Sequence, residues 1–187
     1  MNTLLVDNRT KHLDQICRLL PEAPTIVPWD RLSADDALGR DLIILSGGTN
    51  VPNVTDFEEF FLIQKSIVLG SSVPIIGICL GAQVIAHTYG ATLRDLGTKR
   101  DGIITIDPTA AGTDLLGIRS PFDATEAHRW AISSLPDSFD ILATSTDGIE
   151  LFKHHTRQIW GFQFHPEYLS DRTSGDEIFR VILSEIR

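Results

Sequence analysis

The sequence predicts an α/β protein with a doubly wound, mostly parallel central sheet flanked by helices, and with an antiparallel extension. Three apolar runs in the first half, at residues 4–6, 42–45 and 75–78, are continuous rather than alternating. Continuous apolar strands are typical of a parallel sheet that helices cover on both faces. The second half carries short strand-like runs broken by turn residues such as Asp147-Gly148, which predicts antiparallel pairing there.

Apolar spacing and capping residues predict the individual elements. Leucines and isoleucines at helical spacing indicate a helix over residues 11–20, and a capping-box spacing at 55–58 starts another over 57–69. A third helix should run from residue 80 to 89 and end at Gly90, a favourable residue just past a helix. The other expected elements are strands at 25–27, 103–106, 141–144, 149–152 and 159–164, and a final helix at 175–186.

The bulk composition indicates a single soluble domain spanning residues 1–187. The chain is 42% hydrophobic and 22% charged, which is ordinary for a globular protein. A net charge of −9 disfavours nucleic-acid binding through a broad basic surface. Neither a signal peptide nor an apolar run of membrane-spanning length is expected. Two cysteines make no disulfide framework, so we expect a reduced, cytoplasmic protein without membrane association.

The segment Gly77-Ile78-Cys79-Leu80-Gly81-Ala82-Gln83 has the pattern of a nucleophile at a strand-to-helix turn. Glycines on both sides of the cysteine permit a sharp turn without a Cβ clash. The thiol would lie at a helix N-terminus, where the helix dipole favours the thiolate. The alternative interpretation, a buried structural cysteine, is the common one for a lone free thiol; we apply it to Cys17, which lies in an apolar helical pattern.

A base for this nucleophile is found in Phe164-His165-Pro166-Glu167, at the end of an alternating strand-like run. In an extended segment, side chains two residues apart face the same way. The imidazole of His165 could therefore activate Cys79 while Glu167 orients the ring, which is the logic of a catalytic triad. Because both motifs are present, we prefer this interpretation to an incidental surface His-Glu pair.

These motifs, together with Leu45-Ser46-Gly47-Gly48, resemble those of the class I (triad-type) glutamine amidotransferases in order and separation. The resemblance covers the chain nearly end to end and implies a flavodoxin-like sheet. It implies that glutamine is hydrolysed to glutamate and ammonia through a γ-glutamyl thioester. Cys79 would be the nucleophile, His165 the general acid and base, and Glu167 its orienting partner.

The same resemblance implies the remaining site residues. Backbone N–H groups of Gly48 and Leu80 map onto the oxyanion hole of the family. Gln83 stands at a position that contacts the substrate, and one helical turn past Cys79 it returns to the same side of the helix. A looser match implies that backbone groups of Arg129 and Trp130 hold the amino-acid end of glutamine.

We expect neither a metal site nor a cofactor in this chain. No spacing of cysteine, histidine and acidic residues resembles a metal-binding motif, and His154-His155 is interpreted as a pair of surface residues. His128 is assigned at most to the rim of the active site. In the family, ATP and Mg²⁺ belong to a partner synthetase, so the expected partners here are L-glutamine and a synthetase subunit that receives the ammonia.

The acceptor reaction is left open by the sequence. The segment Thr25-Ile26-Val27-Pro28 and the length resemble the separate glutaminase subunit of GMP synthases, which we place first. Asp7-Asn8 and Gly97-Thr98-Lys99 are similar to the small subunit of anthranilate or aminodeoxychorismate synthases. A stand-alone γ-glutamyl hydrolase that acts on a γ-glutamyl conjugate is the alternative enzyme, and a non-catalytic binding protein is disfavoured because the triad is intact.

Overall fold

The computed structural model describes residues 1–48, 60–168 and 170–186 of the chain. Its sheet has the strand order β2-β1-β3-β4-β11-β10-β9-β6-β7, with β5 paired to β8 and β8 paired to β10. The strands are β1 Thr3–Asn8, β2 Thr25–Pro28, β3 Leu42–Gly48, β4 Ile75–Ile78, β5 Thr92–Asp95, β6 Gly102–Pro108, β7 Phe122–Glu126, β8 Trp130–Ser134, β9 Phe139–Thr144, β10 Ile149–His154 and β11 Ile159–Phe162. The helices are α1 Leu13–Leu19, α3 Leu62–Gly70, α4 Leu80–Thr88, α5 Ala110–Leu116 and α6 Gly175–Glu185, with 3-10 turns η1 Trp29–Arg31 and η2 Ala34–Ala37.

The first five strands of that order, β2-β1-β3-β4-β11, are parallel, and their central members are buried on both faces. Leu5 of β1 pairs with Ile44 of β3, which pairs in turn with Ile76 of β4. These three side chains belong to one buried cluster, whereas Leu4 and Val6 belong to a second. Alternate side chains of a strand face opposite sides, so each continuous apolar run supplies both cores, as predicted.

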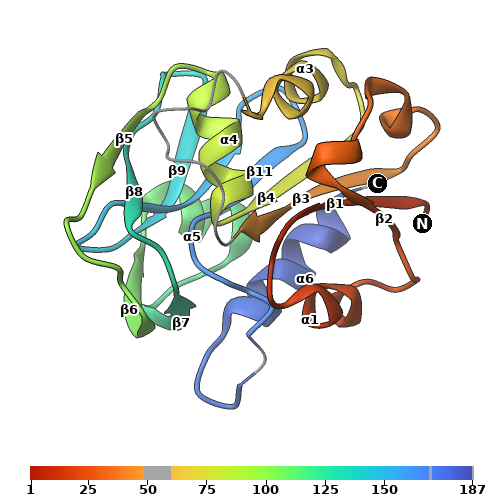
Figure 1. Cartoon of the computed structure of the whole chain (residues 1–187). Helices are drawn as coiled ribbons and strands as arrows, with labels where there is room; N and C mark the ends of the chain where they lie inside the picture. Colours follow the sequence, from red (N-terminus) through yellow and green to blue (C-terminus); the bar gives the residue numbers. More distant parts are fainter. Residues whose placement is uncertain (49–59, 169, 187) are drawn as a thin grey trace.

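Helices cover the two faces of this parallel sheet (Figure 1). Ile16 of α1 and Phe179 of α6 pack in the first cluster, whereas Ile67 of α3 and Val84 of α4 pack in the second. In such doubly wound sheets, ligands bind beyond the carboxyl ends of the strands. That edge is where β3 and β4 end, directly before the predicted nucleophile.

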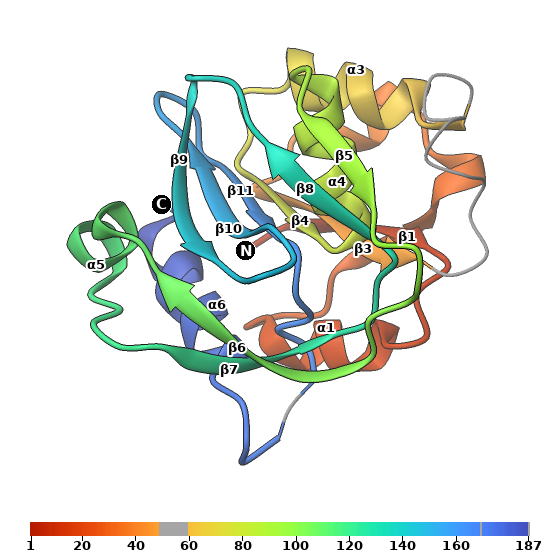
Figure 2. The same cartoon turned by 90° about the vertical axis from the view of Figure 1, so that its left-hand side faces the viewer.

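The second half forms the predicted antiparallel extension. β10, β9, β6 and β7 follow β11 with antiparallel pairing, and Figure 2 shows β6 and β7 running side by side at the border of the sheet. The structure adds β5, β7, β8 and α5, which the sequence analysis did not anticipate. β11 ends at Phe162, so the predicted strand at 159–164 is two residues too long.

The predicted helices are present with shifted boundaries. α1 is shorter than the predicted 11–20, and α4 ends at Thr88, with Gly90 at a φ of 87° just beyond it. α3 covers the second part of the predicted helix at 57–69. The predicted start of that helix and its capping box at 55–58 lie outside the described residues.

Candidate active site

Cys79 occupies a sharp turn between β4 and α4. Its φ of 48° and ψ of −104° are unusual for a residue with a side chain, and such strain is typical of a nucleophile elbow. The flanking glycines are required by close packing. A Cβ on Gly77 would lie 2.6 Å from the backbone of Gly81, and a Cβ on Gly81 would lie 2.1 Å from the carbonyl oxygen of Leu45. The two glycines therefore let the turn press against the sheet.

His165 and Glu167 lie just beyond β11, where the chain leaves the sheet. The backbone N–H of His165 donates to the carbonyl of Thr125 at 2.8 Å, which fixes the residue beside β7. The distance from His165 Nδ1 to Glu167 Oε1 is 2.7 Å. Glu167 lies in a turn rather than in a strand, but the predicted contact between the two side chains is present.

Cys79 and His165 both lie next to Gly47, at the ends of the strands. A Cβ built on Gly47 would lie 3.1 Å from Cε1 of His165 and 3.6 Å from Cβ of Cys79. The elbow is also tied to β11, because the N–H of Cys79 donates to the carbonyl of Phe162 at 2.7 Å. Side chains contributed by positions more than eighty residues apart in the chain thus converge at one edge of the sheet.

The convergent groups are shielded from water and electrostatically coupled. Cys79 and His165 are 5% and 7% exposed, and Glu167 is completely buried. Burial alone would lower the pKa of His165, but the neighbouring Cys79 sulfur and the Glu167 carboxylate raise that pKa well above its usual value. With Nδ1 against Glu167, Nε2 is buried without a hydrogen-bond partner among the described residues. This nitrogen is available for proton exchange with a substrate.

The contact with Glu167 should control both the protonation and the orientation of His165. In Glu167→Gln, we expect the pKa of His165 to fall and amide hydrolysis to slow by on the order of 10²-fold or more. The raised pKa means that protonated His165 adds stability below the unfolded-state value near 6.5, and this stability is lost as the pH rises through the folded-state pKa. In the variant this loss should occur at lower pH.

An NMR titration of the ring Cε1–H of His165, combined with unfolding midpoints across pH, measures both effects. Asp140→Asn is the matched control, because Asp140 forms an exposed ion pair with His155 at 3.1 Å on the surface. An unchanged titration of His165 in Glu167→Gln would contradict the assigned orienting role.

The two predicted oxyanion donors come from the end of β3 and the start of α4. Leu80 is the first residue of α4, and the first N–H groups of a helix lack partners within the helix. Gly48 is the last residue of β3, next to Gly47, which lies against both Cys79 and His165. Both residues are thus near the nucleophile, their role as oxyanion donors stays a prediction, and α4 directs the positive end of its dipole toward Cys79.

Gln83 is buried in α4 and connects three segments of the site. Its Nε2 donates to the carbonyl of Trp130 at 2.7 Å and to Oε1 of Gln163 at 3.1 Å. Gln163 in turn lies with Nε2 at 3.9 Å from the sulfur of Cys79. The structure therefore joins Gln83 and Trp130 to the nucleophile, although Gln163 was not singled out in the sequence.

The side chain of Arg129 lies at the surface, where it pairs with Asp95. The guanidinium forms two bonds of 2.8 Å to the carboxylate of Asp95, and the side chain is 55% exposed. Its carbonyl accepts from the N–H of Leu96 at 2.9 Å. Substrate contact by Arg129 remains a prediction, and its backbone N–H is the group left to make it.

Tyr168 and His12 lie beside His165, and sequence reasoning missed both. The rings of His165 and Tyr168 are 5.3 Å apart in an edge-to-face arrangement. The hydroxyl of Tyr168 is hydrogen-bonded to Nε2 of His12 at the start of α1. Burial lowers the pKa of His12, which favours the neutral ring. Because the contact joins residues 156 positions apart, no local spacing could have revealed it.

The interpretation of His154 as a surface residue was wrong. His154 is 8% exposed and packs against Tyr89 and Phe139, and its Nδ1 accepts from the N–H groups of Thr156 and Arg157. His155 is exposed, as predicted. Neighbouring residues of a strand face opposite sides, so an adjacent pair at the end of a strand is divided between the core and the solvent.

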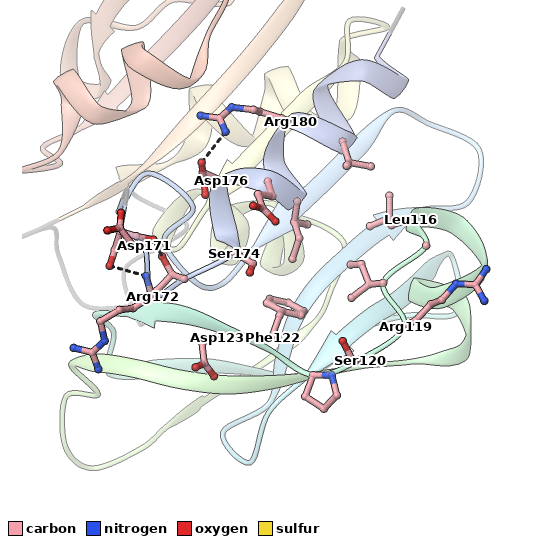
Figure 3. Close-up of a pocket in the computed structure, with 18 residues that line it drawn as sticks. Leu116, Arg119, Ser120, Phe122, Asp123, Asp171, Arg172, Ser174, Asp176 and Arg180 are labelled. Atoms are coloured by element: carbon pink, nitrogen blue, oxygen red, sulfur yellow. Dashed lines mark hydrogen bonds and ion pairs between the residues drawn. The ribbon is translucent and has the colours of Figure 1, made fainter.

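A pocket of about 960 Å³ lies elsewhere, between the segment before β7 and the start of α6 (Figure 3). Its charges are mixed, because Arg119 and Arg172 share it with Asp123 and Asp176. Cys79, His165 and Glu167 are not among its lining residues. We therefore assign no catalytic role to this pocket.

The fold and the site together define the class of the protein: an α/β enzyme with a cysteine nucleophile on an elbow and a His-Glu pair beside it. The family model of class-I glutamine amidotransferases matches residues 4–184. The chain belongs to this family and is a glutamine amidotransferase, with the doubly wound fold that the sequence predicted.

Relatives and solved structures agree with this assignment. A glutamine-hydrolysing GMP synthase subunit from Methanococcus maripaludis strain C5 is 32% identical, covering 94% of this chain and 86% of the relative. The corresponding subunit from Methanothermobacter thermautotrophicus is 30% identical, covering 94% and 93%. A crystal structure of a Thermoplasma acidophilum protein described as a candidate GMP synthase subunit is 30% identical, with a TM-score of 0.83 over 98% of this chain and 93% of that one.

A glutamine amidotransferase structure from Thermotoga maritima shares the fold, with a TM-score of 0.77 at 14% identity over 100% of this chain and 97% of that one. In the described part of the chain, the helices are too short or too polar to span a bilayer.

Proposed function

We propose that this chain hydrolyses the side-chain amide of L-glutamine and supplies the ammonia to a synthetase subunit that forms GMP. The observation that carries this proposal is the meeting of Cys79 and His165 around Gly47, with Glu167 hydrogen-bonded to the far nitrogen of the imidazole. A nucleophile, a base and an orienting carboxylate in that arrangement are the parts that acyl transfer requires.

In the proposed reaction, the sulfur of Cys79 attacks the amide carbon of glutamine and forms a tetrahedral intermediate. His165 donates its proton from Nε2 to the departing nitrogen, which leaves as ammonia, and a γ-glutamyl thioester remains on Cys79. Water then gives a proton to His165 and attacks the thioester, which releases glutamate and regenerates the thiolate–imidazolium pair. The raised pKa of His165 supports this cycle, because it favours the imidazolium that must protonate the leaving group.

Backbone groups complete the proposed site. The N–H groups of Leu80 and Gly48 would stabilise the oxyanion, and one such donor is typically worth about 3 kcal/mol of barrier. Gln83 and the backbone of Arg129 and Trp130 would hold the amino-acid end of the substrate. Each step of this chemistry is assigned to side chains and backbone groups of this chain; ATP and Mg²⁺ would act in the partner.

The GMP-forming acceptor is supported by the relatives, which are subunits of GMP synthases and align over nearly the whole of this chain. An anthranilate- or aminodeoxychorismate-type partner and a stand-alone γ-glutamyl hydrolase are the competing outcomes of the following test.

The test uses a tagged chain recovered from its native cell together with the proteins that bind it. We expect an ATP-dependent synthase subunit to co-purify, and the mixture to form GMP with glutamine as the nitrogen source. Ammonia release by the chain alone should be slower than release by the complex. Strong activity of the isolated chain with a preference for γ-glutamyl conjugates would overturn the subunit assignment, and co-purification of a chorismate-using enzyme would overturn the acceptor.

A further inference from the structure

Three ionisable side chains, Glu126, His128 and Glu150, meet inside the protein. They lie near the segments that carry Gln163 and His165. Glu126 ends β7, His128 lies between β7 and β8, and Glu150 lies in β10. One ligating atom from each lies within 4.8 Å of the others, and Nε2 of His128 is 3.2 Å from Oε1 of Glu126. Glu126 and Glu150 are completely buried, and His128 is 5% exposed. His128 is thus as buried as Cys79 and His165, and its assignment to the rim of the active site stays a prediction.

The polar atoms of this cluster are unusually poor in hydrogen bonds. Apart from the 3.2 Å contact between Nε2 of His128 and Oε1 of Glu126, the oxygens of Glu126, the ring nitrogens of His128 and Oε2 of Glu150 are buried without a well-formed hydrogen bond in the described structure. Ser145 donates to the other oxygen of Glu150 at 2.7 Å, which leaves Oε2 available. Buried polar groups are almost always paired, and several unpaired atoms at one point indicate a missing partner. Such atoms accept protons or bind a cation.

Charge also points to a cation. Two carboxylates in a dry interior carry a large desolvation cost unless positive charge compensates them. Arg100 is a cation that acts on Glu126 electrostatically. However, its guanidinium forms bonds of 2.8 and 3.0 Å with both oxygens of Asp147, so it already serves another carboxylate. A divalent ion would balance both glutamates and leave His128 neutral, the form in which imidazole coordinates metals.

We propose that Glu126, His128 and Glu150 form a structural binding site for a divalent transition-metal ion, with Zn²⁺ as the best fit. Zinc takes carboxylate oxygen and imidazole nitrogen at about 2.0–2.2 Å, which places tetrahedral ligand atoms about 3.3 Å from one another. The 3.2 Å separation of His128 and Glu126 matches this spacing. The ligand atom of Glu150 lies within 4.8 Å of the other two, so Glu150 would rotate toward the ion, and a water molecule would complete the coordination.

This ion would stabilise the position of the strands around the active site without taking part in the reaction. Thr125, directly before Glu126, accepts the backbone hydrogen bond of His165 at 2.8 Å. The carbonyl of Glu150 accepts from the N–H of Gln163 at 2.8 Å. His128 opens the segment that contains Arg129 and Trp130. A metal at this point would clamp the strands that present the general base and the predicted substrate segment, and its binding does not depend on the proposed reaction.

The experiment measures Zn²⁺ binding by calorimetry in a Cys17→Ser/Cys79→Ala background, so that neither thiol competes for the ion. We expect one equivalent to bind and to raise Tm by several degrees. Glu126→Gln and Glu150→Gln in the same background should each weaken binding by at least about 100-fold, since each removes a ligand charge. His155→Ala removes the imidazole of the exposed His155–Asp140 pair and should leave binding unchanged.

A second readout does not require the variants to fold. Crystals of the parent background soaked in Zn²⁺ should show one anomalous-scattering peak bounded by Glu126, His128 and Glu150. Absence of binding to the parent protein would overturn the proposal, as would a peak at another place or binding that both glutamine variants retain. In that case, protons shared within the cluster would compensate the two carboxylates.

Discussion

Cys79→Ala should reduce glutamine hydrolysis by about 10⁴-fold or more while the fold is retained. The sulfur is the proposed nucleophile, and loss of one member of a catalytic triad removes most of its rate enhancement. The fold should survive because Cys79 is a small residue in a turn whose shape Gly77 and Gly81 determine, and alanine keeps its Cβ. Ammonia release by the chain in complex with its partner, together with the unfolding midpoint, measures both parts.

Cys17→Ser is the matched control, because Cys17 is the other cysteine, lies partly buried in α1 and packs against the core. It should leave hydrolysis unchanged and lower stability only slightly. If Cys79→Ala retained hydrolysis, or if Cys17→Ser abolished it, the assignment of the nucleophile would be wrong. If the proposed partner forms GMP, its reaction with added ammonia in place of glutamine should persist in Cys79→Ala, since the proposal assigns that reaction to the partner.

The parallel half of the fold could be predicted because each strand is encoded by its own residues. Leu42-Ile43-Ile44-Leu45 is apolar on both faces, and only a sheet covered on both sides buries such a run. The glycines around Cys79 similarly specify a turn from local sterics alone. The two-residue spacing of His165 and Glu167 likewise predicted that the imidazole and the carboxylate meet, and the structure reproduces their contact.

The unpredicted elements lack such a local signal. β5 contains Thr92-Leu93-Arg94-Asp95 and is largely exposed, so it has no apolar face to identify it. β7 carries Phe122 and Ala124 as its buried apolar positions, and its pairing with β6 comes from tertiary contact. α5 has seven residues, including Gly112, which disfavours a helix by propensity.

The distances between side chains that come from separate strands could not be predicted from the sequence either. Glu126 and Glu150 are 24 positions apart and come together because Thr125, at the end of β7, bridges to His165 just after β11, and β11 pairs with β10. No spacing rule for metal ligands covers that arrangement, so the expectation of no metal site rested on motifs alone. The direction of the Arg129 side chain, toward Asp95, likewise depends on the pairing of β5 with β8.

Gly81→Ala should lower the free energy of unfolding by about 3 kcal/mol or more and should also reduce hydrolysis. The added Cβ would lie 2.1 Å from the carbonyl oxygen and 2.7 Å from the carbonyl carbon of Leu45, in the middle of the sheet. Backbone atoms of a central strand cannot yield as a flexible side chain does, so α4 must move away from β3. That movement carries Cys79 and Leu80 away from His165, and small misplacements of reacting groups are costly.

Urea unfolding and ammonia release measure the two effects in parallel. Gly70→Ala is the matched control, since Gly70 is a helical glycine at the end of α3 with nothing within 4 Å of an added Cβ. It should leave stability unchanged or raise it by about 0.5 kcal/mol, because alanine favours a helix over glycine. Equal unfolding midpoints for the two variants would show that α4 does not press on β3 as described. If Gly81→Ala were destabilised but hydrolysed glutamine at the normal rate, the contact between Gly81 and Leu45 would stabilise the fold without positioning Cys79. That result would contradict the argument for the placement of the nucleophile.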